Sequence, residues 1–216
     1  MTSPSLSSLV KVIQAKLGDA FLHSSLRLGE LTLEVEKSSI CRTLTFLRDA
    51  QGLRFKQLID ICGVDYPDRT PRFEIVYHLL SLQMNHRIRI KIRVNEDEAA
   101  PSIISVFKGA NWWEREIWDM FGIPFTEHPD LRRLLSDYTF EGHPLRKDFP
   151  LTGYVEVRYD DEVKKVMYEP MNLQQAFRKF DYLSPWEGMT PTLPGDEKAT
   201  ATQPSTPSDA AERKTG

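Results

Sequence analysis

The apolar positions of the first part of the chain follow two periods, one typical of helices and one typical of strands. In residues 6–17 the apolar residues recur at helical spacing after a run of serines, and Gly18 lies where a helix would end. This pattern predicts a first helix. Residues 29–37 (GELTLEVEK) alternate with period two, which predicts a half-buried strand. The residues after Ser39 predict a second helix with one apolar stripe.

Two further strands are predicted downstream. Residues 73–82 are apolar on both faces, as in the central strand of a sheet, and Asn85 and His86 mark a turn. Residues 87–94 (RIRIKIRV) then alternate almost without a break. The stretch 55–65 is ambiguous, and we expect its start to be partly helical. A short helix is expected at 101–107 because proline favours the first helical position.

The basic side of the strand at 87–94 has two interpretations. It can bind phosphates or an acidic partner, which makes a nucleic-acid or acidic-partner binding module the alternative function of the chain. It can also be the solvated side of an ordinary amphipathic strand, which we favour. Between the two binding interpretations a protein partner ranks above nucleic acid, because no aromatic residues interleave for base stacking. The basic residues are Arg87, Arg89, Lys91 and Arg93.

A tryptophan-rich helix is predicted at 111–121 (NWWEREIWDMF), with Asn111 as its cap and Gly122 after its end. Its apolar stripe carries Trp113, Ile117, Met120 and Phe121, and its other sides carry Glu114, Glu116 and Asp119. Arg115 and Asp119 have the spacing of an ion pair on one helix face. Tryptophan and arginine are enriched at interface hot spots, which favours a docking surface. The alternative is a helix anchored to its own domain with a solvated charged side.

The chain changes character after this helix. Residues 123–150 are rich in proline, glycine and charge, and 154–159 with 163–169 predict a β-hairpin. Aromatic residues follow at Phe177, Phe180, Tyr182 and Trp186. Beyond Gly188 the composition is that of a disordered tail. We therefore predict a compact α/β domain at 1–122, an extended partner-docking segment at 123–188 and a disordered tail at 189–216.

Composition excludes several classes of protein. The 216 residues fit one domain with appendages, and 28 Lys+Arg against 31 Asp+Glu leave a formal charge of −3, which disfavours bulk nucleic-acid binding. No stretch approaches the roughly 20 apolar residues of a membrane-spanning helix. Cys41 and Cys62 are the only cysteines. They are too few for an iron–sulfur cluster, which takes about four thiolates, and they suit a reducing compartment.

Familiar catalytic motifs are absent from the sequence. It contains no G-x-G-x-x-G, P-loop, H-E-x-x-H or G-x-S-x-G pattern. The strongest remaining candidates are His128 and His143, as metal ligands or acid–base groups. We favour a structural role for both His-Pro steps, because their spacing across a proline-interrupted segment fixes no coordination geometry. The nearby carboxylates are Asp130, Asp137, Glu141 and Asp148.

Three long runs resemble one known family. EREIWDMFGIPFTEHPDLRRLL, DYTFEGHPLRKDFPLTGYVEVRYDDE and YEPMNLQQAFRKFDYLSPWEG are similar to the 30 kDa subunit of respiratory NADH:quinone oxidoreductase, complex I. The resemblance covers about residues 6–190 and is densest at 111–188. One departure is Glu127, where relatives commonly have glycine. The signature and interface residues that it implies are Trp113, Glu114, Arg115, Glu116, Asp119, His128, Arg132, Leu134, His143, Arg146 and Trp186.

The resemblance implies an α+β fold, in which a domain with a mixed sheet and flanking helices precedes an extended segment with a hairpin. It also implies a non-catalytic subunit of the peripheral arm, needed for assembly and for support of the electron path from NADH to quinone. Its partners would be the large quinone-site subunit and the iron–sulfur subunit next to it. FMN and the iron–sulfur clusters would belong to partner subunits, and this chain would hold no cofactor. The proton-translocating complex would keep it at the cytoplasmic face of the bacterial inner membrane.

Overall fold

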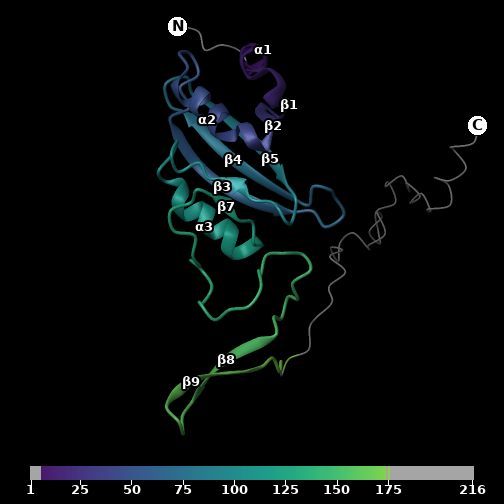
Figure 1. Cartoon of the computed structure of the whole chain (residues 1–216), viewed down its shortest axis with the longest axis vertical. Coiled ribbons are helices and arrows are strands. Elements are labelled where there is room, and N and C mark those ends of the chain that lie inside the picture. The colour runs from purple at the N-terminus through teal and green to yellow at the C-terminus, as the bar shows by residue number, and fades with distance from the viewer. Residues whose placement is uncertain (1–5, 174, 176–216) are drawn as a thin grey trace, which may run out of the picture. The chain divides into compact units, whose positions relative to one another are not determined.

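The computed structural model describes residues 6–173 and 175 (Figure 1). Its helices are α1 (Leu6–Leu17), α2 (Ile40–Asp49) and α3 (Ala110–Phe121), with 3-10 turns at Gly18–Ala20 and Lys37–Ser39. Its strands are β1 (Phe21–Arg27), β2 (Glu30–Val35), β3 (Gln57–Asp65), β4 (Phe73–Ser81), β5 (His86–Val94), β6 (Ala100–Pro101), β7 (Phe125–Thr126), β8 (Val155–Asp160) and β9 (Lys165–Pro170). Among the described residues, no helix is long and apolar enough to cross a membrane. Trp186 and the predicted tail at 189–216 lie outside the described residues.

Five strands form a mixed sheet in the order β1-β2-β5-β4-β3. Neighbouring strands are antiparallel except for β2 and β5, which run parallel with Leu33 opposite Ile90. β4 has a neighbour on each side, as its apolar pattern predicts. The mixed sheet and its helices confirm the prediction of an α+β fold.

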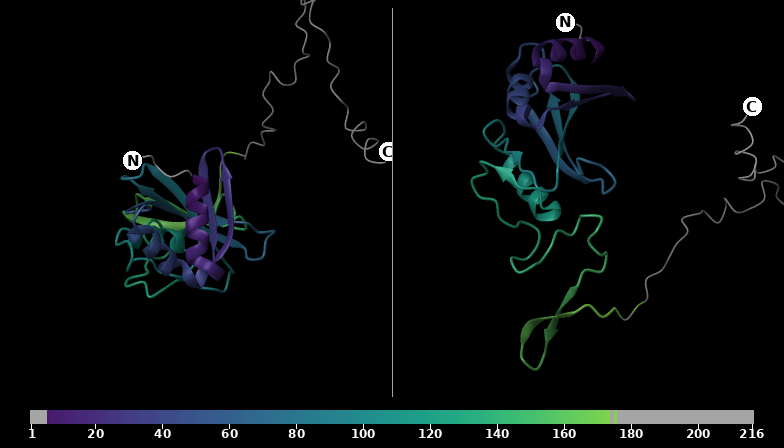
Figure 2. Two further views of the ribbon diagram at one scale, coloured as in Figure 1. Left: turned by 90° about the horizontal axis from the view of Figure 1, so that it is seen from above. Right: turned by 45° about the vertical axis from the view of Figure 1, so that its right-hand side comes forward.

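Helices α1, α2 and α3 lie along one side of this sheet (Figure 2). The hydrophobic core lies between the two layers. Its members from the helices are Leu9, Ile13 and Leu17 of α1, Ile40, Leu44 and Leu47 of α2, and Ala110 and Ile117 of α3. β5 turns Ile88, Ile90, Ile92 and Val94 into the same core. Because side chains alternate along a strand, the arginines and the lysine of β5 fall on the opposite side of the sheet.

Two local predictions are wrong. The stretch 55–65 has no helix at its start, because Phe55 is buried and β3 covers Gln57–Asp65, paired antiparallel to β4. Pairing with β4 buries its apolar residues, and local propensity does not decide the conformation. Residues 101–107 form no helix either. Ala100 and Pro101 belong to β6, which pairs with β7 instead.

The boundaries of two other elements differ from the expected ones. β1 is absent from the prediction because it is exposed along most of its length and has no apolar alternation; it forms by pairing with β2. α3 begins at Ala110, with Gly109 rather than Asn111 at the cap position. It ends at Gly122, whose φ of 75° is the left-handed conformation expected of a helix C-terminus.

Burial changes abruptly after β7. Ile123 and Phe125 still belong to the hydrophobic core. Between Thr126 and Leu173 every described residue is partly or fully exposed. The predicted hairpin is confirmed as β8 paired with β9.

Candidate docking site

α3 packs closely on β3, and Gly63 makes this approach possible. An ideal Cβ at Gly63 would stand 2.7 Å from Cδ2 of Phe121, well inside ordinary carbon–carbon contact. The helix buries Ala110, Ile117 and Met120. The position of α3 on the sheet therefore depends on close contact between the Gly63 backbone of β3 and the Phe121 ring of α3.

Glu114 is a buried acid in the middle of α3, with no part of it exposed. Its Oε2 accepts a hydrogen bond from the Ser102 hydroxyl at 2.7 Å, and its Oε1 accepts one from the Ile103 N–H at 2.7 Å. Burial raises the pKa of Glu114 to about 7, although both hydrogen bonds act to lower it. The side chain thus ties the turn after β6 to the helix.

Asp119 is the second fully buried acid of α3. One carboxylate oxygen accepts hydrogen bonds from the backbone N–H groups of Leu134, Leu135 and Ser136, at 3.0, 2.8 and 2.9 Å. The other oxygen pairs with Nη1 of Arg133 at 2.7 Å. Burial acts to raise the pKa of Asp119, but these four donors outweigh it and hold the pKa at about 2.

Arg115 does not pair with Asp119 as its spacing predicts. Its guanidinium donates from Nε to the carbonyl of Arg132 at 3.0 Å and from Nη2 to the carbonyl of Arg133 at 2.9 Å. Arg115 and Asp119 therefore hold the same loop, one through its carbonyls and the other through its N–H groups. The alternative of a solvated charged side on α3 does not hold for Glu114, Arg115 and Asp119, which are all buried.

Both candidate histidines contact the main chain. Nδ1 of His128 accepts the Asp130 N–H at 3.1 Å, so its Nε2 carries the proton and donates to the Asn111 carbonyl at 3.2 Å. His143 donates from Nδ1 to the Asp119 carbonyl at 2.9 Å, and burial lowers its pKa. Within the described part of the chain, no three His, Cys, Asp or Glu side chains converge as a metal site would require.

Arg146 closes the end of α3. Its Nε donates to the Phe121 carbonyl, and its Nη1 pairs with Glu96 at 2.6 Å. Beside it, Arg72 binds Asp65 through two nitrogens, at 2.7 and 2.9 Å. The network also includes Asp148, which pairs with Arg72 at 3.1 Å, and the Lys147 N–H, which donates to Asp65 at 2.8 Å.

The remaining residues of the predicted set are more open. Trp113 and Leu134 are partly buried, while Glu116 and Arg132 are exposed. Arg132 contacts Asp130 at 2.7 Å and the Tyr138 hydroxyl at 2.9 Å. Trp112, which the sequence did not single out, is 66% exposed. The sequence likewise gives no signal for the network around Arg72, because its members lie far apart along the chain.

Exposed apolar side chains concentrate in the chain that these contacts hold. We call residues 128–154 the anchored segment. Its exposed large apolar residues are Leu135, Tyr138, Leu145, Leu151 and Tyr154. The hairpin that follows adds Val155, Val157, Tyr159, Val163, Val166, Met167 and Tyr168. So many exposed large apolar side chains in one part of the chain are typical of a protein–protein interface.

The basic side of β5 has carboxylate partners within its own sheet. Arg89 pairs with Glu30 at 2.9 Å, and Lys91 pairs with Glu74 at 2.7 Å. Arg93 likewise pairs with Glu34 at 2.8 Å. These pairs neutralise most of the basic strand, so the geometry favours the amphipathic strand over a phosphate-binding face.

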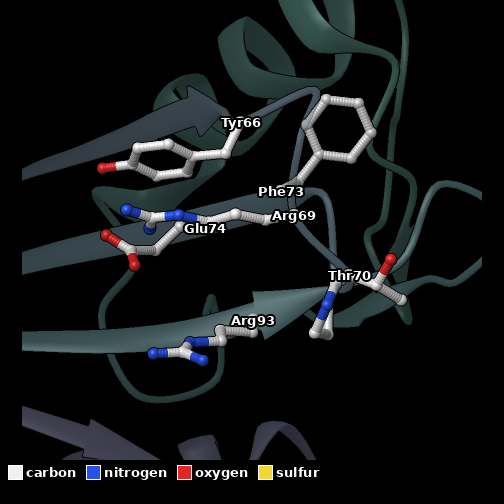
Figure 3. Close-up of a pocket in the computed structure, with 7 residues that line it drawn as sticks. Tyr66, Arg69, Thr70, Phe73, Glu74 and Arg93 are labelled. Atoms are coloured by element: carbon white, nitrogen blue, oxygen red, sulfur yellow. The ribbon is translucent and has the colours of Figure 1, made fainter.

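A small pocket of about 140 Å³ opens near the start of β4 (Figure 3). Tyr66 and Arg69 line it, and the Arg69 guanidinium lies 3.7 Å from the centroid of the Tyr66 ring. Glu74 and Arg93 line it and are engaged in the ion pairs of the sheet. Sites for cofactors and drug-sized ligands usually measure roughly 300–1,000 Å³, so this hollow is small for such a ligand.

Comparison with known proteins identifies the family. The family described as the 30 kDa subunit of respiratory-chain NADH dehydrogenase matches residues 33–155. The chain belongs to this family. The corresponding subunit of NADH-quinone oxidoreductase from Hyphomonas neptunium is 58% identical over 92% of this chain and 98% of its own length. Its counterpart from Paramagnetospirillum magneticum is 61% identical over 80% of this chain and 86% of its own.

A solved structure shares the fold of this 30 kDa-subunit family member. A chain of the membrane-bound sulfane sulfur reductase, described as an archaeal respiratory membrane complex, aligns with a TM-score of 0.59 and 25% identity. The alignment covers 67% of this chain and 85% of that one.

Proposed function

We propose that this chain is a non-catalytic subunit of a proton-translocating NADH-quinone oxidoreductase. It supports assembly of the peripheral arm and the electron path from NADH to quinone. Its partners are the large quinone-site subunit and, nearby, the iron–sulfur subunit. Membrane association comes through the complex, at the cytoplasmic face of the bacterial inner membrane. Family membership supports the assignment to this complex. The exposed apolar residues of the anchored segment support docking on partner subunits.

The observation that carries this proposal is the contrast between the two sides of the anchored segment. Its polar contacts point inward, to Arg115, Asp119 and the end of α3. Its exposed apolar residues, such as Leu135 and Tyr138, are 62% and 73% exposed. A loop held this firmly binds a partner at little cost in conformational entropy, because it is ordered beforehand.

We assign FMN and the iron–sulfur clusters of the complex to other subunits. Both cysteines of this chain contact oxygen atoms: Cys41 lies 3.3 Å from the Ser102 carbonyl, and Cys62 lies 2.7 Å from Asp60. Burial, followed by the contact with Asp60, raises the pKa of Cys62 to about 12. Thiols bind metals as thiolates, so a raised pKa disfavours ligation. The contacts of the two cysteines and the raised pKa of Cys62 therefore support a structural role for both residues.

Co-purification from membranes tests the docking proposal. Leu135→Asp places a charge on the exposed apolar side of the anchored segment. Leu82→Asp is the matched control, because Leu82 is 76% exposed in the turn between β4 and β5. The tagged chain is recovered from membranes solubilised in mild detergent, and its partners and NADH:quinone activity are measured.

We expect the wild-type chain and Leu82→Asp to bring down the quinone-site and iron–sulfur subunits with activity. We expect Leu135→Asp to lose at least about tenfold of that recovery, the equivalent of roughly 1.4 kcal/mol. Absence of NADH-quinone oxidoreductase subunits from the wild-type sample would contradict the proposed function. Equal recovery of the two variants would contradict docking through the anchored segment.

A further inference from the structure

The hairpin of β8 and β9 has two faces of opposite character. Its register places residues directly opposite one another, and such pairs share a face. The apolar face consists of Val155, Val157, Tyr159, Val166, Tyr168 and Pro170. The polar face consists of Glu156, Arg158, Asp160, Lys165, Met167 and Glu169. Only Met167 interrupts the polarity of the second face.

The apolar face has little cover within the described chain. Val157, Tyr159 and Val166 are 56%, 56% and 58% exposed. The polar face, in contrast, is stabilised by the ion pair of Arg158 with Glu169 at 2.8 Å. A two-stranded hairpin is at best marginally stable in water, so it needs a surface to pack its apolar face against.

We infer that the apolar face of the hairpin lies flat on the apolar surface of one larger partner protein in the complex, with the polar face turned away. The inference rests on the proposed function and assigns which side of the hairpin binds. Pairing of a partner strand with a free edge of β8 or β9 is a different mode, since it leaves the apolar face exposed.

The size of the face excludes a second copy of the hairpin as its sole cover. Strands of six residues are about 20 Å long, and two of them make a face on the order of 200 Å². A stable interface buries about 800 Å² on each partner. A larger protein that also covers exposed residues such as Leu135, Tyr138 and Leu151 adds to that area, whereas hairpin-to-hairpin contact does not.

The charge of the hairpin disfavours a lipid surface. Residues 155–170 contain five acidic and three basic side chains. Segments that bind anionic membranes carry an excess of Lys and Arg instead. An uncharged apolar area on a protein is therefore the better match.

Two adjacent residues test the assignment. Val166→Glu and Met167→Glu place the same charge on opposite faces at neighbouring positions, 58% and 45% exposed in the free chain. Neither side chain belongs to the core, so both variants keep the compact domain. Each tagged variant is expressed in place of the wild-type chain, and its incorporation into detergent-solubilised NADH-quinone oxidoreductase is quantified.

We expect Val166→Glu to lower incorporation at least tenfold and Met167→Glu to change it less than twofold. Hydroxyl-radical footprinting of the wild-type chain gives a second measure, in which assembly protects Tyr159 and leaves Met167 reactive. Equal incorporation of the two variants, loss of both, or equal protection of the two residues overturns the assignment. Sedimentation of the free chain with phosphatidylglycerol vesicles, abolished by Val166→Glu, overturns it in favour of lipid. Failure of the wild-type chain to incorporate contradicts the proposed function itself.

Discussion

The carboxylate of Asp119 and the guanidinium of Arg133 form an ion pair of 2.7 Å at the point where α3 meets the chain that follows it. Asp119 is fully buried, and its second oxygen accepts three consecutive backbone N–H groups. A buried charge is tolerated only when it is paired and hydrogen-bonded in this way. The ion pair therefore decides the path of the anchored segment along the helix.

Asp119→Asn is expected to destabilise the protein by about 2–4 kcal/mol, because the amide cannot replace the charge or accept all of the bonds. Chemical denaturation measures the loss, and hydrogen exchange at residues 134–136 locates it. Asp130→Asn is the control. It breaks an Asp–Arg contact of equal length, 2.7 Å, but one that is exposed to solvent, so its loss should destabilise the protein far less. Equal effects of the two variants would contradict the role of Asp119.

The pKa of Asp119 also predicts an acid-dependent step. Its folded-state pKa of about 2 is below the usual 3.8, so the unfolded chain binds this proton more readily. The stabilisation is present above pH of about 4 and is lost as the pH falls through about 2. Chemical denaturation of the wild-type chain should show its free energy of unfolding decrease between pH of about 4 and about 2. The Asp119→Asn variant should lack the part of this decrease that comes from Asp119.

Glu114 has the opposite dependence. Its folded-state pKa of about 7 is above the usual 4.5, so the folded chain holds the proton more tightly. The contribution of Glu114 to the free energy of unfolding is fully present below a pH of about 4.5. It falls by on the order of 3 kcal/mol as the pH rises to about 7. Glu114→Gln keeps a neutral group able to bond Ser102 and the Ile103 N–H. We expect the variant to lose this pH dependence in denaturation between pH 5 and 8, and an unchanged slope would contradict the assignment.

The regular elements could be predicted because their own residues carry the period. Residues 87–94 alternate almost without a break, and 6–17 repeat an apolar stripe, so β5 and α1 appear where expected. β1 could not be predicted, because it is an edge strand whose pairing with β2 involves no apolar alternation of its own. The stretch 55–65 shows the same limit: its conformation depends on β4, which the local sequence does not contain.

The candidate site also has a part that could be predicted from the sequence and a part that could not. The residues of α3 could be identified from their types and from the family resemblance. Their partners could not, because Arg115 contacts main-chain carbonyls and Asp119 contacts main-chain N–H groups, which have no side-chain signal. Helical spacing suggested that Arg115 and Asp119 pair with each other. A covering loop offered both of them stronger partners, and only the tertiary structure reveals that loop.

Gly63 provides the last prediction, on how α3 is seated. A Cβ at this position would lie 2.7 Å from Cδ2 and 2.9 Å from Cε2 of Phe121, so Gly63→Ala should force the helix or the ring to move. Overpacking of this kind costs about 1–3 kcal/mol. Gly109→Ala is the control, because its Cβ would meet only Trp113, at 3.7 Å. Thermal denaturation should therefore separate the two alanine variants.

A double variant distinguishes steric conflict from other effects of the alanine. Phe121→Leu removes the ring atoms that the new Cβ would meet, so Gly63→Ala should cost less in that background than in the wild type. The difference between the two costs is the coupling energy of the two positions, expected to be about 1 kcal/mol. If the costs are equal, the ring does not limit the approach of α3 to β3. Because Arg115 and Asp119 lie on this helix, an altered seat should also increase hydrogen exchange in the loop that they hold.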